Sequence, residues 1–77
     1  MNDLTITQVG VNIKTIRRMR GLSQTELSLL VGHKSPAWLS WVEQGERVIN
    51  IEDLIILARV LKVPINKLFL PPHDEIS

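Results

Sequence analysis

The chain has 77 residues, which is enough for one small domain with a single hydrophobic core. It contains no cysteine, so disulfides and thiolate metal sites are excluded as sources of stability. Its net charge of +1 is lower than expected of a domain that binds nucleic acid by charge alone. No apolar run approaches the roughly 20 residues that a membrane helix needs, and the N-terminus lacks a signal pattern, so we expect a cytoplasmic protein.

The first predicted helix begins at residue 7 or 8, with Thr7 as its N-cap, and ends at Arg20. Val9, Ile13 and Ile16 recur at the spacing of one helix face, which is typical of an amphipathic helix. A cluster of basic residues in this helix can be a solvated surface or an edge that faces phosphate groups, and both interpretations stay open. The cluster consists of Lys14, Arg17, Arg18 and Arg20.

A second helix is predicted from Gln24 to Val31. Ser23 and Glu26 have the spacing of a capping box, in which each side chain accepts a hydrogen bond from the other residue's backbone N–H. Gly21 suits the end of the preceding helix, because glycine readily adopts the left-handed conformation found there. The side chains expected to be buried are Leu27, Leu30 and Val31.

A third helix is predicted from Pro36 to Gln44. Ser35 is a suitable N-cap, Pro36 suits the first helical position because its missing N–H would be unpaired there, and Gly45 ends the helix. The second and third helices are each only about two to three turns long, so they need packing against other elements to be stable. The residues of the third helix expected to be buried are Leu39 and Val42.

A fourth helix is predicted from Ile51 to Leu61, with Asn50 as its N-cap, and a short fifth helix over residues 64–70. The fourth helix is expected to bury Leu54, Leu57, Ala58 and Leu61. The last two helices carry more apolar side chains than one small core can bury, which predicts a homodimer interface. Its expected residues are Ile55, Ile56, Val60, Ile65, Phe69 and Leu70.

Several segments between Gly10 and Phe69 follow one another at a familiar spacing: Ile13–Arg17, Gly21–Leu27, Leu39–Gly45, Leu54–Leu61 and Val63–Phe69. In these residues the chain resembles the Cro/C1-type (XRE) helix-turn-helix family of bacterial and phage transcription regulators. The resemblance implies an all-α, compact five-helix bundle of the lambda-repressor-like DNA-binding type. Its second and third helices would form the helix-turn-helix, with the third in the major groove of DNA.

Together, the predicted elements, their apolar surface and the resemblance give an expected domain division and function. Residues 1–6 would be an N-terminal arm, residues 7–70 the DNA-binding domain, and residues 71–77 a flexible tail or the start of a linker. The protein would be a sequence-specific, repressor-like transcription regulator. It would bind double-stranded DNA as a homodimer on a palindromic operator. Its two recognition helices would then lie about 34 Å apart.

By position, Gln24 matches a family glutamine that faces a DNA phosphate together with the helix N-terminus. Arg17 and Glu43 match a partly buried ion pair, which we favour over a DNA contact for Arg17. Lys34 and Arg47 flank the third helix, where they are either solvated or near the DNA backbone. The expected phosphate contacts are Arg20, Ser23, Gln24, Lys34 and Arg47.

The third helix departs from the family's pattern where polar side chains are expected to reach base edges. Those positions hold Pro36, Ala37, Trp38 and Trp41, none of which can make bidentate hydrogen bonds to a base. Trp38 either packs at the rim of the core or meets DNA or a protein partner, and Trp41 either covers the first helix or does the same. The turn over residues 32–35 is one residue longer than usual. The recognition helix as expected comprises Ser35, Pro36, Ala37, Trp38, Ser40, Trp41 and Gln44.

Two alternatives to a complete regulator stay open. The domain can be a protein-interaction module that keeps the fold with reduced base readout, or the DNA-binding part of a longer protein. An enzyme is not expected, because the sequence has no paired carboxylates, no nucleophile with a base and no glycine-rich phosphate loop. No cofactor is implied. His33 and His73 each stand alone, and a lone histidine is a poor candidate for a metal ligand, so no metal site is expected.

Overall fold

The computed structural model describes residues 2–32 and 35–69, with side chains from Thr7 onward. The described residues form helices and connecting turns, with no strand among them. The elements are α1 (Asn2–Met19), α2 (Gln24–Leu30), α3 (Pro36–Glu43), α4 (Ile51–Leu61) and the 3₁₀ helix η1 (Ile65–Leu68).

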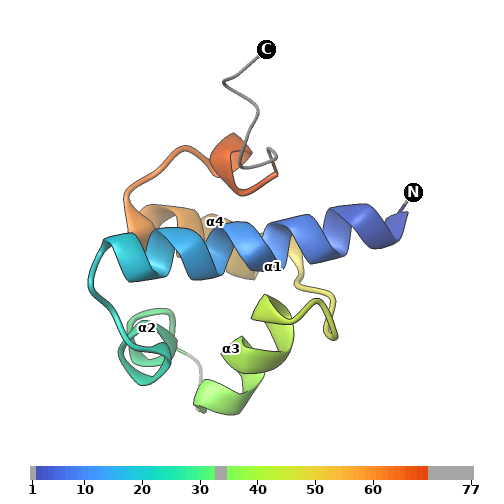
Figure 1. The fold of residues 1–77 in the computed structure, drawn as a ribbon. Coiled ribbons are helices and arrows are strands. Elements are labelled where there is room, and N and C mark those ends of the chain that lie inside the picture. The colour runs from blue at the N-terminus through green and yellow to red at the C-terminus, as the bar shows by residue number, and fades with distance from the viewer. Residues whose placement is uncertain (1, 33–34, 70–77) are drawn as a thin grey trace.

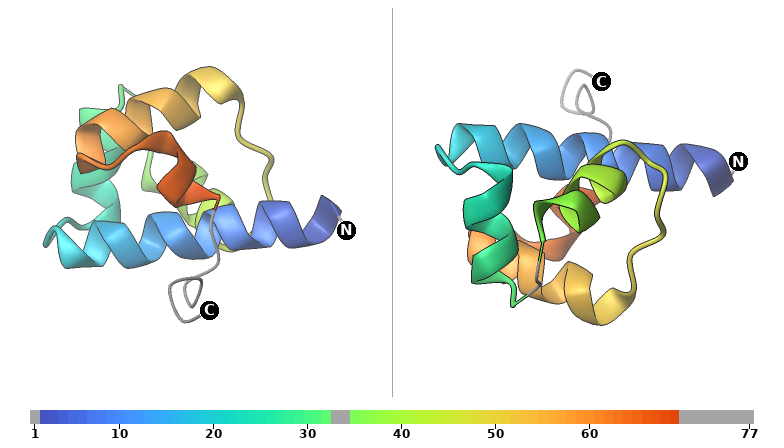
Figure 2. Two further views of the ribbon diagram at one scale, coloured as in Figure 1. Left: turned by 90° about the horizontal axis from the view of Figure 1, so that it is seen from above. Right: turned by 90° about the horizontal axis from the view of Figure 1, so that it is seen from below.

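Helix α1 is the longest element and crosses the middle of the molecule, with α2 and α3 on one side and η1 on the other (Figure 1). Helix α4 runs beside α1, as the views from above and below both show (Figure 2). Direct contacts join α1 to α3, α4 and η1, and join α2 to α3. Helix α2 is therefore held mainly by α3, and α3 in turn packs on α1.

The hydrophobic core lies where these helices meet. Its residues are Val9, Ile13, Leu27, Val31, Leu39, Val42, Leu54, Leu57, Ala58, Leu61 and Leu68. This confirms the buried positions predicted for the first, third and fourth helices, with Ile16 partly buried against the core. Leu30 is an exception, because 56% of its surface is exposed. The buried residues are Leu27, Ser28 and Val31. Around the helix axis, Leu30 lies on the opposite side of Leu27 from Ser28 and Val31, so it is outside the buried face.

The bounds of α4 are those predicted, and its cap is confirmed. The Asp53 N–H donates to Asn50 Oδ1 at 2.8 Å, as an N-cap requires. Helices α2 and α3 each end one residue earlier than predicted, at Leu30 and Glu43. Ser35 precedes α3 with extended backbone but makes no side-chain cap hydrogen bond, contrary to the expectation for this residue.

Helix α1 begins at Asn2, so the prediction of a start at residue 7 or 8 with Thr7 as N-cap is wrong. No proline or glycine stands in residues 2–6, and nothing in that stretch prevents the helix from extending toward the N-terminus. The segment expected to be an arm is helical from Asn2 onward.

The predicted fifth helix over residues 64–70 is observed as the four-residue 3₁₀ helix η1. The structure therefore has four α-helices and one 3₁₀ helix among its described residues, where five helices were expected. Asn12 on α1 contacts the end of this element, since its amide donates to the Leu68 carbonyl at 2.9 Å. That contact takes up a carbonyl at the end of η1 and holds the short turn against α1.

Candidate nucleic-acid interface

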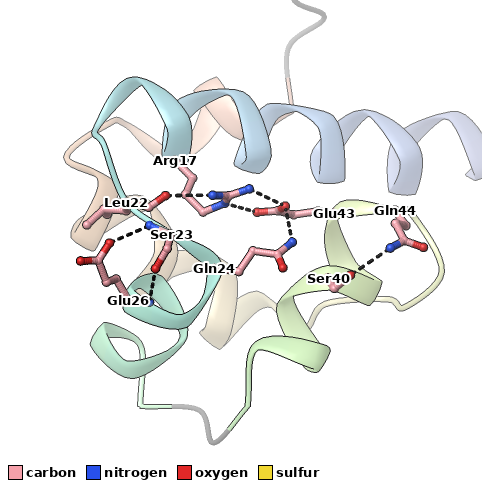
Figure 3. Close-up of polar contacts among 8 residues, drawn as sticks. All are labelled: Arg17, Leu22, Ser23, Gln24, Glu26, Ser40, Glu43 and Gln44. Carbon is pink, nitrogen blue, oxygen red and sulfur yellow. Dashed lines mark hydrogen bonds and ion pairs between the residues drawn. The ribbon is translucent and has the colours of Figure 1, made fainter.

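The start of α2 is fixed by the predicted capping box. The Glu26 N–H donates to Ser23 Oγ at 3.0 Å, and the Ser23 N–H donates to Glu26 Oε1 at 2.7 Å (Figure 3). Both partners lie at the surface, and together they satisfy two backbone donors that a helix N-terminus would otherwise leave without a partner.

Arg17 and Glu43 form the ion pair that the family resemblance implied. Arg17 Nε lies 2.7 Å from Glu43 Oε2, and Nη2 lies 3.1 Å from Oε1, which makes the contact bidentate. Only 8% of the Arg17 side chain and 2% of the Glu43 side chain are exposed. Arg17 Nη1 also donates to the Leu22 carbonyl at 2.8 Å. One guanidinium group therefore ties α1 to the end of α3 and to the turn before α2 (Figure 3).

Gln24 extends this network from the first position of α2. Its Nε2 donates to Glu43 Oε1 at 3.0 Å, so its side chain points toward the ion pair (Figure 3). The contact joins the start of α2 to the end of α3 and holds the two helices of the motif at a set angle. A phosphate contact by the Gln24 amide stays a prediction.

Arg20 joins the end of α1 to the end of α4. Its Nε donates to the Leu61 carbonyl at 2.8 Å and its Nη2 to the Lys62 carbonyl at 3.3 Å. These carbonyls belong to the C-terminal end of α4, where a helix carries partial negative charge and favours a cation. Arg20 thereby helps to hold α1 against α4. A phosphate contact by this exposed side chain stays a prediction.

The exposed side of α3 includes Ser35, Pro36, Ala37, Trp41 and Gln44. Gln44 Nε2 donates to Ser40 Oγ at 2.9 Å (Figure 3). Trp38, by contrast, is partly buried and packs against the core, which favours the rim position over a place on DNA or a partner.

Trp41 and Arg47 form a pair at the end of α3. The Arg47 Cζ lies 4.9 Å from the centre of the Trp41 ring, within the range of a cation–π contact. Trp41 is 44% exposed. The Trp41 ring therefore holds the positively charged Arg47 guanidinium beside the C-terminal end of α3.

Four residues discussed from the sequence lie outside the described part of the chain. Lys34, His33 and Leu70 belong to residues that the structure does not describe, and so does His73. Among the described residues, no group of three or more His, Cys, Asp or Glu side chains could hold a metal ion. Within the same ranges, none of the helices has both the length and the apolar composition to span a membrane.

The predicted dimer residues divide into two groups. Ile55 and Phe69 are 42% and 44% exposed, as an interface requires. Ile56, Val60 and Ile65 are partly buried against the core of their own chain, so they are less available. Two further apolar side chains, Val48 and Ile51, are 71% and 58% exposed near the start of α4. Val48 lines an apolar groove of about 140 Å³ together with Val9, Leu54 and Phe69.

Two residues that hold other elements against α1 were not singled out from the sequence. A Cβ atom at Gly10 would overlap the Val42 carbonyl oxygen and lie 2.8 Å from that of Glu43, so α1 and α3 are in backbone contact. A glycine inside an amphipathic helix was the signal for such a close approach. Asn12 was the other. It is a buried polar residue, and its place beside the apolar row of α1 was the signal in the sequence.

The chain matches the family model HTH_3, described as helix-turn-helix, over residues 13–68. Its fold is similar to that of the restriction-modification controller protein C.AhdI from Aeromonas hydrophila, with 27% identity, a TM-score of 0.80, and coverage of 87% of this chain and 96% of the other. It is also similar to the hypothetical transcription factor NHTF from Neisseria, with 26% identity, a TM-score of 0.86, and coverage of 94% and 82%.

An HTH_3 family transcriptional regulator from Vibrio cholerae is 29% identical with a TM-score of 0.80, over 90% of this chain and 38% of the other. No curated protein sequence matches the chain significantly. The family match covers more than half of the chain and includes α2, α3 and both partners of the ion pair. The chain therefore belongs to the HTH_3 family of helix-turn-helix proteins, the Cro/C1 (XRE) type.

Proposed function

We propose that the protein is a sequence-specific DNA-binding transcription regulator of the repressor-like kind. The observation that carries the proposal is the helix-turn-helix itself, in which Arg17, Gln24 and Glu43 brace α2 and α3 against α1. This bracing leaves one side of α3 exposed, as a helix that enters the major groove must be. The names of the similar structures, a controller protein and a transcription factor, support the same function.

The proposed contacts with DNA phosphates lie on both sides of α3. Ser23 and Gln24 stand at the start of α2, and Arg47 follows α3 with its charge supported by Trp41. Lys34 precedes α3 in the sequence, and Arg20 at the end of α1 completes the set. Such contacts position a protein on DNA and make its binding depend on salt, whereas α3 would supply contacts to the bases. Binding to DNA in a bacterial cell would place the protein in the cytoplasm.

A homodimer on a palindromic operator is part of the proposal. Ile55 and Phe69 from the predicted interface are exposed, and Val48 and Ile51 extend the apolar surface toward the start of α4. A twofold dimer buries the same surface on both copies and would set two α3 helices about 34 Å apart, one turn of DNA.

The test is titration of the purified chain with random duplex DNA at two salt concentrations, followed by selection of a binding site from random sequences. We expect binding that weakens steeply with salt and a selected site with twofold symmetry. The Lys67→Ala variant is a matched control, because Lys67 lies on η1, on the opposite side of α1 from α2 and α3 (Figure 1). It should bind DNA like the unchanged protein.

A protein-interaction module on the same fold is the second candidate. The exposed Pro36, Ala37 and Trp41 on α3 favour it, because these side chains cannot make bidentate hydrogen bonds with a base. Absence of DNA binding at low salt would support this candidate and reject the regulator. A DNA-binding part of a longer protein is also compatible, since the chain spans 38% of the Vibrio cholerae regulator.

A further inference from the structure

The first turn of α3 has an apolar exposed surface. Pro36 and Ala37 are the first two residues of this helix, and both are exposed. If α3 is the recognition helix, as the proposed function requires, its N-terminal residues are those that come closest to base edges. The chemistry at this end of the helix therefore bears on which bases the protein can distinguish.

The buried side of α3 decides which residues share its outer face. Leu39, Val42 and Glu43 are buried, and they fix the rotation of the helix about its axis. Ala37, Trp41 and Gln44 follow at the spacing of one helix face and are all exposed. Ala37 is consequently the N-terminal member of the outward-facing row.

Further along α3, Gln44 and Trp41 already make contacts within the protein. Gln44 Nε2 donates to Ser40 Oγ at 2.9 Å, and the Trp41 ring supports the Arg47 guanidinium. Both pairs lie toward the C-terminal end of α3. Within the described part of the first turn, Ser35 is the one polar side chain, and the surface beside it is formed by Pro36 and Ala37.

In the major groove, the feature that matches an apolar side chain is the C5-methyl group of thymine. We propose that α3 recognises C5-methyl groups of pyrimidines through Ala37, with Pro36 alongside it. Thymine is the common source of this group, and 5-methylcytosine presents the same methyl group at the same ring position. The inference rests on the proposed function and adds to it the base chemistry that the half-site offers.

The experiment uses the operator selected from random DNA and replaces each thymine, one at a time, with uracil. This change removes only the C5-methyl group and keeps the base pairing. We expect one or two positions in each half-site at which Kd rises about fourfold, the effect of one buried methyl group. Uracil at thymines outside the protected site is the control and should leave Kd unchanged.

A second arm separates the two sources of the methyl group. At the sensitive position, the T·A pair is replaced by a C·G pair with and without a methyl group on cytosine C5. Tighter binding of the methylated duplex shows that the protein senses the methyl group in either pyrimidine. Equal binding of the two duplexes, together with a uracil effect, restricts the recognition to thymine.

The Ala37→Gly variant tests the assignment to Ala37, because it removes the one methyl group of that side chain. In this variant the uracil effect at the sensitive position should fall below about twofold, whereas Lys67→Ala should retain it in full. The uracil series on the unchanged protein does not depend on how well the glycine variant folds.

The outcomes separate this inference from the proposed function. Specific DNA binding with no sensitivity to uracil at any position would overturn the methyl recognition and leave the regulator standing. An undiminished uracil effect in the folded Ala37→Gly variant would overturn the role of Ala37. Absence of all DNA binding at low salt would instead reject the proposed function, and the inference with it.

Discussion

Arg17 on α1 and Glu43 at the end of α3 are 26 residues apart in the sequence and joined by two charge-assisted hydrogen bonds, of 2.7 and 3.1 Å. Both side chains are buried, so neither charge can be solvated if its partner is lost. Gln24 adds a third donor to the same carboxylate. The orientation of α3 relative to the rest of the domain therefore depends on this one cluster.

Replacement of Glu43 by alanine should leave the Arg17 guanidinium buried without its counter-ion. We expect the free energy of unfolding to fall by about 3 to 5 kcal/mol, as for other buried ion pairs that lose one partner. Urea unfolding followed by circular dichroism measures the change. Glu46→Ala is the matched control, because Glu46 is exposed and should alter stability by less than about 0.5 kcal/mol. An unchanged midpoint for Glu43→Ala would contradict a stabilising role for the pair.

Gly10→Ala should destabilise the fold although alanine is the better helix former. The gain in helix propensity is about 1 kcal/mol, but the new Cβ would overlap backbone carbonyls of α3 that cannot move independently. We expect a net loss of about 1 to 3 kcal/mol, measured by thermal unfolding. Val11→Ala, at a neighbouring exposed position of α1, should have a much smaller effect. A stabilised Gly10→Ala protein would mean that α1 and α3 are further apart than described.

The two predicted N-caps Asn50 and Ser35 should differ in their contribution to stability. Asn50 accepts a hydrogen bond from the Asp53 N–H, so Asn50→Ala should cost about 1 kcal/mol. Ser35 makes no side-chain cap hydrogen bond, and Ser35→Ala should therefore change the free energy of unfolding by less than about 0.5 kcal/mol. Equal losses in the two variants would show that Ser35 caps α3 in solution.

Arg47 should contribute one phosphate contact, and Trp41 should act through it. Arg47→Ala is expected to weaken DNA binding similarly for all sequences and to reduce the salt slope by about one unit. Trp41→Leu should weaken binding in the unchanged protein and have little effect in the Arg47→Ala background, because the cation–π contact is then already absent. Additive losses in this double-mutant cycle would indicate that Trp41 contacts DNA by itself.

Ile55→Lys should shift the proposed dimer toward monomer, because it places a charge in the exposed apolar surface around Ile51, Ile55 and Phe69. Sedimentation velocity at several concentrations gives the dimer dissociation constant. Leu29→Lys is the matched control, since Leu29 is 67% exposed on α2 and outside the proposed interface. A monomeric unchanged protein at high micromolar concentration would reject the homodimer.

Features that depend on residues close together in the chain could be predicted from the sequence. The bounds of α4, the Ser23–Glu26 capping box and the buried rows of α1, α3 and α4 all follow from interactions that reach three or four residues along a helix. The predicted start of α1 was wrong because Thr7 is not the N-cap. Residues 2–6 contain no glycine or proline that would end a helix there, and α1 continues to Asn2.

The sequence by itself determined the helical class, the bounds of α4, the starts of α2 and α3, most of the core and membership of the HTH_3 family, because these depend on local periodicity, capping and the order of motifs. Only the tertiary structure decided that Arg20 binds the end of α4, that Gln24 reaches Glu43, and that Arg47 stacks on Trp41. Those contacts join the ends of different helices or, for Arg47 and Trp41, a loop to the helix before it, and which side chains meet depends on how these elements pack. Gly10 allows the close approach of α1 and α3, and the buried Leu39, Val42 and Glu43 fix the face that α3 presents outward.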